Sequence, residues 1–236
     1  MKKLLSLTRG AIDKYHMIDE GDKIAVGVSG GKDSVALLYA LGRIQAFYPK
    51  HFELVAITLD YQFNGVSQDF TEIEAVCQKF NIPYIIKETK LWEIIFETRK
   101  EKNPCSLCAK MRRGILHDTA IENGCNKIAL GHHADDAVET FMMNLLNGGT
   151  LDCFSPVSYL SKKNLYQIRP FVFAWEKDVI RAVQSENLPI VKSKCPADKV
   201  TNREQTKNYL KSLNLIYPGV KEKILGAMEK SHLKQW

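Results

Sequence analysis

The sequence predicts an α/β fold in which a parallel, twisted sheet carries helices on both faces and a short helical extension follows at the C-terminus. Short apolar segments alternate with segments of helical periodicity through residues 1–150, which is typical of a parallel sheet covered on both faces. Polar or glycine-rich clusters follow three of the apolar segments. The chain has 236 residues, of which 45% are hydrophobic and 25% charged, and this composition excludes wholesale disorder.

Each element is predicted from a local pattern. Continuous apolar runs indicate buried strands at 24–28, 54–59, 84–86 and 127–130. Helical spacing of apolar residues indicates helices at 2–18, 33–46, 68–80, 107–123 and 134–146. Beyond residue 150 the pattern changes: we expect a loop at 151–164, a short strand at 166–170 that a proline ends, and helices at 176–185 and 219–232.

A glycine loop stands between the first predicted strand and the helix after it. It reads Ser29-Gly30-Gly31-Lys32-Asp33-Ser34. Glycines allow a tight turn with inward-pointing N–H groups, and the helix N-terminus adds partial positive charge, so the loop suits phosphate binding. The spacing is not that of a Walker A loop, and a G-x-G-x-x-G fingerprint is absent from the sequence. The alternative is that the glycines only make a turn.

Two of the six cysteines, Cys105 and Cys108, form a C-x-x-C pair at the start of a predicted helix. The helix N-terminus and the nearby Lys110, Arg112 and Arg113 are expected to lower the pKa values of these thiols. A zinc knuckle would need a second such pair, which the sequence lacks. Zinc, redox chemistry and an iron–sulfur site therefore remain open for the pair.

The other four cysteines are expected to differ in role. Cys77 and Cys125 have apolar neighbours, which indicates buried packing residues. Cys195 is the best-placed distant thiol to complete a site with the C-x-x-C pair, whereas Cys153 is ambiguous. Disulfides among the six are not expected in a reducing compartment.

A histidine–aspartate turn, Gly131-His132-His133-Ala134-Asp135-Asp136, follows the fourth predicted strand. Its carboxylates would lie at the same sheet edge as the glycine loop, where they could hold Mg²⁺ on bound phosphates. Alternatively, the aspartates cap the helix that begins there and the histidines are packing residues. Asp60 ends the second strand at the same edge.

The chain carries a formal net charge of +6, which is compatible with a polyanionic partner such as RNA. Arg203, Lys207 and Lys211 fall on one face if this basic segment is helical. That face would either follow phosphates or be an ordinary solvated surface. No apolar run approaches the roughly 18–20 residues that cross a membrane, and the N-terminus lacks the features of a signal peptide, so we expect a cytoplasmic protein without a membrane partner.

The hexapeptide at 29–34 matches the signature SGGxDS, and in it the chain resembles the PP-loop (N-type) ATP pyrophosphatases. The resemblance implies a PP-loop fold, the adenine nucleotide alpha hydrolase-like form of a Rossmann-like sheet. It also implies that ATP binds over this loop and adenylates a carbonyl oxygen, after which a nucleophile displaces AMP.

Within that superfamily the chain resembles the tRNA 2-thiocytidine synthetase (TtcA) family. The segments that carry this resemblance are 104–108 with 111–116, 127–136, 17–22, 168–170 and 217–219. The resemblance implies that Cys105, Cys108 and Cys195 hold a [4Fe-4S] cluster whose fourth iron binds sulfide for transfer. It also implies tRNA as substrate, a cysteine desulfurase or sulfide as the sulfur donor, and a homodimer.

Domains and site residues follow from the motifs and the resemblance together. Residues 1–190 are expected to form a PP-loop ATPase domain with an N-terminal helix, and residues 191–236 a basic helical extension that carries the third cysteine. The residues expected to act are Ser29, Gly30, Gly31, Lys32, Asp33, Ser34, Asp60, Gly131 and His132 for ATP; Lys32, Asp33, Asp135 and Arg112 for catalysis; Asp136 for Mg²⁺; and Arg113, Lys194, Arg203 and Lys207 for RNA.

The expected function is therefore ATP-dependent tRNA thiolation, in which the C2 carbonyl of a pyrimidine, cytidine 32 at the start of the anticodon loop, is adenylated and then receives sulfur. Lys32 and Mg²⁺ would stabilise the charge that develops on the phosphates. Thiolation of another tRNA nucleotide is an alternative. A ligase resembling tRNA lysidine synthetase would use the same loop without a cluster, and a nucleotide- or RNA-binding module would not catalyse a reaction.

Overall fold

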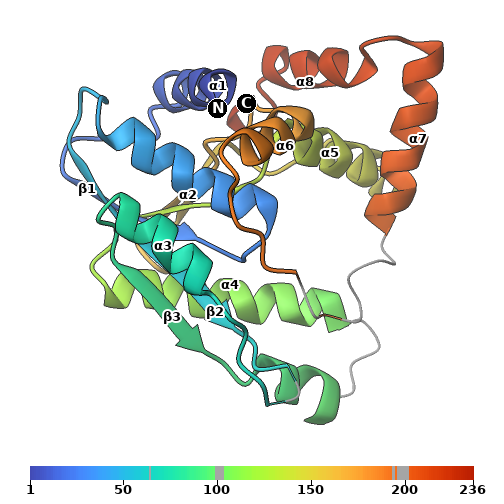
Figure 1. Ribbon diagram of the computed structural model, residues 1–236. Helices are drawn as coiled ribbons and strands as arrows, with labels where there is room; N and C mark the ends of the chain where they lie inside the picture. The colour runs from blue at the N-terminus through green and yellow to red at the C-terminus, as the bar shows by residue number, and fades with distance from the viewer. Residues whose placement is uncertain (64, 99–103, 193–194, 196–201) are drawn as a thin grey trace.

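The computed structural model describes residues 1–63, 65–98, 104–192, 195 and 202–236 (Figure 1). Its strands form one six-stranded sheet of order β3-β2-β1-β4-β6-β5, in which all neighbours are parallel except β5 and β6. The strands are β1 (Asp22–Gly27), β2 (Phe52–Asp60), β3 (Tyr84–Glu88), β4 (Lys127–Ala129), β5 (Val157–Leu160) and β6 (Leu165–Ile168). The predicted parallel α/β sheet is confirmed, with one antiparallel strand added at its edge.

Helices alternate with the strands and continue beyond the last of them. The α-helices are α1 (Lys2–Lys14), α2 (Lys32–Gln45), α3 (Thr71–Lys79), α4 (Pro104–Glu122), α5 (Ala134–Gly148), α6 (Glu176–Ser185), α7 (Asn202–Ile216) and α8 (Val220–Lys230). A short π-helix covers Glu93–Thr98, and a 3-10 turn covers Leu233–Gln235 near the C-terminus.

The two faces of the sheet are covered unequally. Ile24 and Val26 of β1 pack into a large hydrophobic cluster with α1, α2, α5 and α6, whereas Ala25 packs into a smaller cluster on the other face. That second face is covered by α4 through Leu116 and Ala120 (Figure 1). Because neighbouring residues of one strand point to opposite faces, these apolar runs are buried on both sides. Helix α4 therefore covers this face of the sheet, and its first turns can reach the edge formed by the carboxyl ends of the strands.

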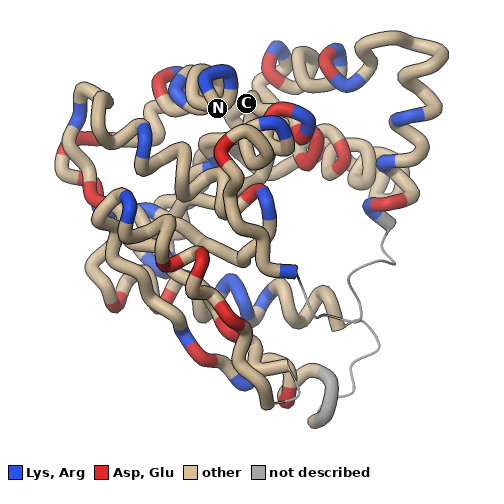
Figure 2. Tube along the Cα trace, viewed as in Figure 1, with Lys and Arg blue, Asp and Glu red and all other residues tan. Residues whose placement is uncertain are grey.

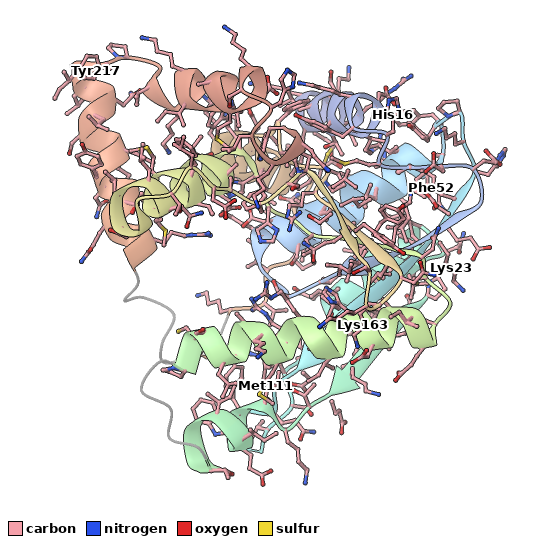
Figure 3. The ribbon with its side chains drawn as sticks, turned by 180° about the vertical axis from the view of Figure 1, so that it is seen from behind. His16, Lys23, Phe52, Met111, Lys163 and Tyr217 are labelled. Atoms are coloured by element: carbon pink, nitrogen blue, oxygen red, sulfur yellow. The ribbon has the colours of Figure 1, made fainter. Side chains whose placement is uncertain are left out.

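Helix α4 is tied to the far edge of the sheet by charge. Lys163, in the turn between β5 and β6, pairs with Asp118 on α4 (Figure 3). The N-terminal half of α4, which carries the C-x-x-C pair, extends toward the carboxyl ends of the strands, where Arg112 and Leu116 line a pocket together with Gly27 of β1.

The C-terminal helices pack onto the sheet-bearing part of the chain. Helices α7 and α8 both contact α5, and Leu210, Leu225, Met228 and Trp236 belong to the large hydrophobic cluster. The indole Nε1 of Trp236 donates a hydrogen bond to the carbonyl oxygen of Phe154 at 2.7 Å. The division between residues 190 and 191 stays a prediction.

The segment 151–164 is not the loop that the sequence indicated. It contains β5, a half-exposed edge strand that pairs antiparallel with β6. An edge strand has only one neighbour and no continuous apolar run, so its sequence gives a weak signal. The helix predicted at 107–123 begins earlier, at Pro104, which suits the first turn because proline lacks the N–H group that this position leaves unpaired. In the residues that the structure describes, no helix has the length and apolar character needed to cross a lipid bilayer.

Candidate active site

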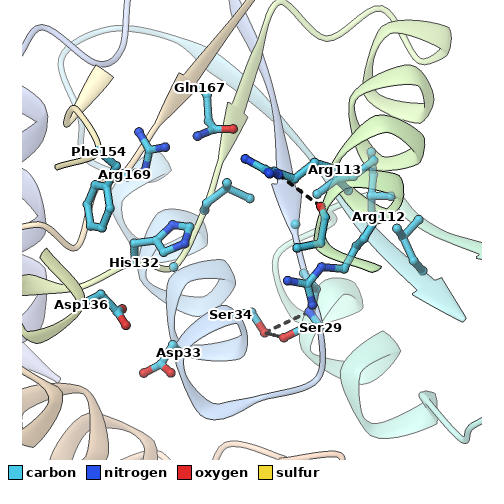
Figure 4. Close-up of a pocket in the computed structure, with 18 of the residues that line it drawn as sticks. Ser29, Asp33, Ser34, Arg112, Arg113, His132, Asp136, Phe154, Gln167 and Arg169 are labelled. Carbon is cyan, nitrogen blue, oxygen red and sulfur yellow. Dashed lines mark hydrogen bonds between the residues drawn. The ribbon is translucent and has the colours of Figure 1, made fainter. Parts of the chain in front are cut away.

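A pocket of about 520 Å³ opens where the carboxyl ends of β1, β2, β4 and β6 meet α4 (Figure 4). This is the edge at which open α/β sheets bind ligands. Figure 4 shows Ser29, Ser34 and Asp33 on one side of the space and His132, Phe154 and Arg169 on another, with Arg112 and Arg113 of α4 reaching in from the opposite side.

The glycine loop is held by its own serines. The Ser34 hydroxyl accepts a hydrogen bond from the Ser29 N–H at 3.1 Å and donates one to the Gly31 carbonyl at 2.9 Å. Gly30 has a φ of +85°, a backbone conformation that favours glycine. The loop is therefore a fixed turn whose two serines line the pocket.

Lys32 is not among the residues that line the pocket, and its side chain pairs with Asp33 and with Glu176 of α6. Its ammonium group lies 2.9 Å from a carboxylate oxygen of Asp33 and 3.2 Å from one of Glu176. Burial lowers the pKa of Lys32, but the two carboxylates overcome this effect, so the pKa lies above its ordinary value. A phosphate bound over the loop would have to take the place of one of these carboxylates. The assignments of Lys32 and Asp33 to ATP stay predictions.

The histidine–aspartate turn caps α5. The His133 N–H donates to the Asp136 carboxylate at 3.0 Å, and Asp136 N–H donates to His133 Nδ1 at 3.3 Å, which makes a reciprocal capping box. A Cβ added at Gly131 would lie 3.0 Å from the backbone of Asp33, so a glycine permits the close approach of the turn to the loop. Asp136 and His132 both line the pocket beside the glycine loop.

Asp135 and Asp60 face away from the pocket. The Asp135 carboxylate accepts hydrogen bonds from Lys221 at 2.6 Å and from the N–H of Glu176 at 2.7 Å, which ties α5 to α8 and α6. Asp60 is buried and accepts from the N–H of Gln62 at 3.1 Å. Neither residue is among those that line the pocket, so their predicted roles rest on the motifs alone.

Two of the three thiols of the resemblance, Cys105 and Cys108, lie at the start of α4, and the charge of Cys195 acts on Cys108. Cys105 is exposed and Cys108 is half-buried in the first turns of the helix, and the charges of both Cys195 and Cys105 act on Cys108. Burial raises the pKa of Cys108, and Arg112 lowers it only in part. The lowered thiol pKa expected from the sequence is therefore wrong for Cys108, because desolvation outweighs the basic neighbour.

Arg112 links these thiols to the pocket. Its guanidinium group is hydrogen-bonded to Tyr61 and feels the charges of Cys108 and Cys195, which together raise the pKa of Arg112 although burial lowers it. Arg112 and Tyr61 both line the pocket. In the described part of the chain, no three or more His, Cys, Asp or Glu side chains are already grouped as a metal site. The donor set of Cys105, Cys108 and Cys195, three thiols with an arginine beside them, nevertheless fits an iron–sulfur cluster.

The predicted RNA-binding cations lie in different settings. Arg113 lines the pocket from α4. Arg203 on α7 pairs with Asp136 at 2.9 Å, and Lys207 pairs with Glu176 of α6 at 2.9 Å, so both cations are engaged with carboxylates. Figure 2 shows basic and acidic residues together along the C-terminal helices. Lys194 lies outside the described residues. The RNA-binding roles of these residues stay predictions.

Several pocket residues were not singled out from the sequence as site residues, among them His117, Phe154, Gln167 and Arg169. Gln167 and Arg169 are 6% and 7% exposed and lie in or just after β6. The signal in the sequence was the presence of polar side chains within a predicted strand. Polar side chains are seldom buried in a sheet unless they bind another group. That signal depends on knowing that β6 is an inner strand.

A profile of the PP-loop domain family matches residues 5–212. The tRNA-cytidine(32) 2-sulfurtransferase of Syntrophotalea carbinolica is 36% identical over 230 residues, which cover 96% of this chain and 88% of that protein. The similarity therefore extends from the glycine loop through the C-x-x-C helix and into the C-terminal helices.

Two solved structures resemble the fold. The U34-tRNA thiolase NcsA from Methanococcus maripaludis, solved with its [4Fe-4S] cluster, has a TM-score of 0.77 at 25% identity and covers 95% of this chain and 77% of its own. The NH3-dependent NAD synthetase from Campylobacter jejuni has a TM-score of 0.52 at 15% identity, with coverage of 100% and 96%, and supports the fold alone. The predicted fold and the predicted family resemblance are confirmed.

Proposed function

Because the chain belongs to the PP-loop domain family, we propose that it is an ATP-dependent tRNA sulfurtransferase that replaces the C2 oxygen of a cytidine, cytidine 32, with sulfur. The observation that carries the proposal is that the glycine loop and the C-x-x-C helix open onto one pocket. Ser29 lines it from the loop, and Arg112, next to Cys108, lines it from α4. Nucleotide activation and sulfur delivery can then act on the same base.

The first step is adenylation at the glycine-loop side. ATP lies over residues 29–34, and the C2 carbonyl oxygen of the base forms a bond to the α-phosphorus while the bond to pyrophosphate breaks. Lys32 exchanges a carboxylate partner for phosphate and stabilises the charge of the leaving group. Arg112 compensates charge on the α-phosphate from the other wall. Asp136 would hold Mg²⁺ on the phosphates, since carboxylates are the ligands this ion prefers, and would release Arg203 to do so.

The second step is displacement of AMP by sulfur. Cys105, Cys108 and Cys195 would hold a [4Fe-4S] cluster that, when bound, supplies an open iron for sulfide. The sulfur forms a bond to C2, the bond from C2 to oxygen breaks, and AMP leaves with that oxygen. Arg112 balances the negative charge of the thiolates at the pocket wall. This positive charge reduces the repulsion between the thiolates and the phosphates of ATP.

The remaining parts of the chain serve the RNA and the assembly. Arg113 and Arg203 line the pocket and would contact tRNA phosphates, together with Lys194 and Lys207. The extension at 191–236 would bring Cys195 and these cations to the ATPase domain at 1–190. A cysteine desulfurase or free sulfide would supply sulfur in the cytoplasm. The exposed Leu215, Ile216 and Tyr217 at the C-terminal end of α7 support a homodimer, because large apolar side chains rarely gather on a free surface.

The test is the chemical identity of the product. The anaerobically purified protein is incubated with unmodified tRNA, ATP, Mg²⁺ and sulfide, and the digested nucleosides are analysed by mass spectrometry. We expect 2-thiocytidine together with equal amounts of AMP and pyrophosphate. Lysidine formed when free lysine is supplied would favour the ligase, and tRNA binding with no AMP release would favour a non-catalytic module.

A further inference from the structure

One end of the pocket holds buried polar atoms that have no partner. His117 Nε2, His132 Nδ1 and Arg169 Nε all lack a hydrogen bond within the described part of the chain, although each belongs to a residue that lines the pocket. Buried polar groups are paired in nearly all native proteins, so three unpaired atoms around one space indicate a polar ligand. These residues lie on the β4, β6 and α4 side of the glycine loop.

The wall of this end is planar and aromatic. The ring centroids of His132 and Phe154 are 5.2 Å apart, and the Arg169 guanidinium lies 4.8 Å from the centre of the Phe154 ring. Figure 4 shows His132, Phe154 and Arg169 gathered on one side of the space, with Gln167 above them. Aromatic rings and an arginine plane are the surfaces on which proteins stack the unpaired bases of RNA.

The polar atoms offer both donors and acceptors. Burial lowers the pKa values of His117 and His132, so both imidazoles are neutral near pH 7 and each presents one donor and one acceptor. Gln167 adds an amide with both. Arg169 offers donors only, and the charged groups that act on it include no described carboxylate. A phosphate would need donors alone, whereas the edge of a nucleobase needs both kinds of group.

The other end of the pocket suits a different ring. On the β2 side it is lined by Ile57, Leu59 and Leu116, which form an apolar slot fit for adenine. The glycine loop, which takes the phosphates, lies between this slot and the polar end. In an in-line attack on the α-phosphorus the base lies opposite the departing pyrophosphate, in a different part of the pocket from adenine, and the polar end is the part that adenine leaves free.

We infer that His117, His132, Phe154, Gln167 and Arg169 form the subsite for the base of the target nucleotide, which we name the base subsite. The inference rests on the proposed function, because that function supplies the pyrimidine. Phe154 and His132 stack on the base, while Gln167 and His117 bond to its polar edge. Cytosine fits, since its edge presents an exocyclic amine donor beside ring and carbonyl acceptors.

The test uses an anticodon stem–loop RNA that carries iodinated cytidine at the target position. Ultraviolet irradiation of its complex with the full-length protein and ATP, followed by peptide mass spectrometry, identifies the residue that touches the base. We expect the crosslink at Phe154 or His132, and a crosslink found at Phe154 should be lost in Phe154→Leu. A crosslink elsewhere on the chain overturns the base subsite.

Binding measurements separate the two ends of the pocket. Gln167→Leu should weaken binding of the stem–loop RNA about tenfold and leave the dissociation constant for ATP unchanged. The matched variant Ile57→Ala, in the apolar slot, should do the reverse. Weakened ATP binding in Gln167→Leu, with RNA binding intact, would mean that adenine occupies this end. If Gln167→Leu does not fold, Gln167→Asn keeps the amide while shortening its reach, and the same comparison applies.

The outcomes distinguish this inference from the proposed function. A crosslink at the base subsite without any thiolated product leaves the subsite standing and overturns the proposed reaction. A thiolated product with a crosslink outside the subsite leaves the reaction standing and overturns the inference.

Discussion

The N–H of Val191 donates a hydrogen bond to the carbonyl oxygen of Gly30 at 3.0 Å. A Cβ added at Gly30 would lie 2.9 Å from the Cβ of Val191, so the segment that follows α6 packs directly on the glycine loop. The two segments are joined by a backbone hydrogen bond as well as by this close contact. A change in the glycine loop should therefore also disturb the segment around Val191.

Gly30→Ala should show this dependence. The φ of +85° at Gly30 and the contact with Val191 leave no room for a methyl group, and we expect a loss of about 2 kcal/mol in the free energy of unfolding. Urea denaturation measures it. Gly226→Ala is the control, because a Cβ at Gly226 meets nothing within 4 Å and the helix α8 should gain up to about 1 kcal/mol. Equal effects of the two variants would contradict this account of the turn.

Lys32→Ala should remove most of the adenylation activity. A cation that stabilises a leaving phosphate contributes about 3–4 kcal/mol to the transition state, so kcat/KM for pyrophosphate release should fall roughly 100- to 1,000-fold. Lys50→Ala is the control, since Lys50 pairs with Asp19 away from the pocket and should retain full turnover. Wild-type turnover in Lys32→Ala would remove the glycine loop from the mechanism.

Glu176 should make stability depend on acid pH. Burial raises the pKa of Glu176, but the opposite effect of Lys207 and Lys32 is larger, so the pKa falls from an ordinary 4.5 to about 2. A carboxylate with a depressed folded-state pKa stabilises the protein above pH 4.5, and this contribution is lost as the pH falls toward 2. Glu176→Gln should therefore be less stable than the wild type at neutral pH, and the difference should fade on acidification. Thermal unfolding across this range measures it, and a constant difference would contradict the assigned ion pairs.

The thiols should differ in reactivity. Burial raises the pKa of Cys77 and of Cys153 to about 12, so at pH 8 almost none of either thiol is ionised. Cys105 is exposed at the start of α4. Iodoacetamide added to the folded apoprotein should alkylate Cys105 well before Cys77 or Cys153, as followed by peptide mass spectrometry. Labelling of Cys153 at the same rate as Cys105 would show that the burial of Cys153 does not hold in solution.

The sheet and its binding edge could be predicted because they depend on local patterns. Buried strands at 24–28 and 54–59 and the turn at Gly131 follow from apolar runs that stop at polar clusters. The edge strand β5 could not be predicted in this way, because its pairing partner is what makes it a strand. Its antiparallel pairing with β6 depends on tertiary structure, not on the local sequence of β5.

Residue type and spacing single out the glycine loop, the C-x-x-C pair and Asp136, and the loop serines and Asp136 do line the pocket. Their roles stay predictions, and the parts of the site that depend on packing could not be predicted. Sequence could not show that Lys32 turns toward Glu176, nor that desolvation of Cys108 outweighs Arg112. The Lys32–Glu176 contact and the burial of Cys108 both depend on how distant segments pack together. Such packing, like the contacts of α7 and α8 with α5, cannot be read from local sequence patterns.

We propose that Cys105, Cys108 and Cys195 form one iron–sulfur site beside the pocket that the glycine loop lines. Iron content and thiolation activity are measured on six anaerobically purified variants, each with one cysteine changed to alanine. Loss of iron and of 2-thiocytidine formation is predicted for the Cys105, Cys108 and Cys195 variants. The Cys77, Cys125 and Cys153 variants should keep both at a packing cost of roughly 1 kcal/mol. Full iron in Cys195→Ala with loss in Cys153→Ala, or no iron in any form of the protein, would contradict the account.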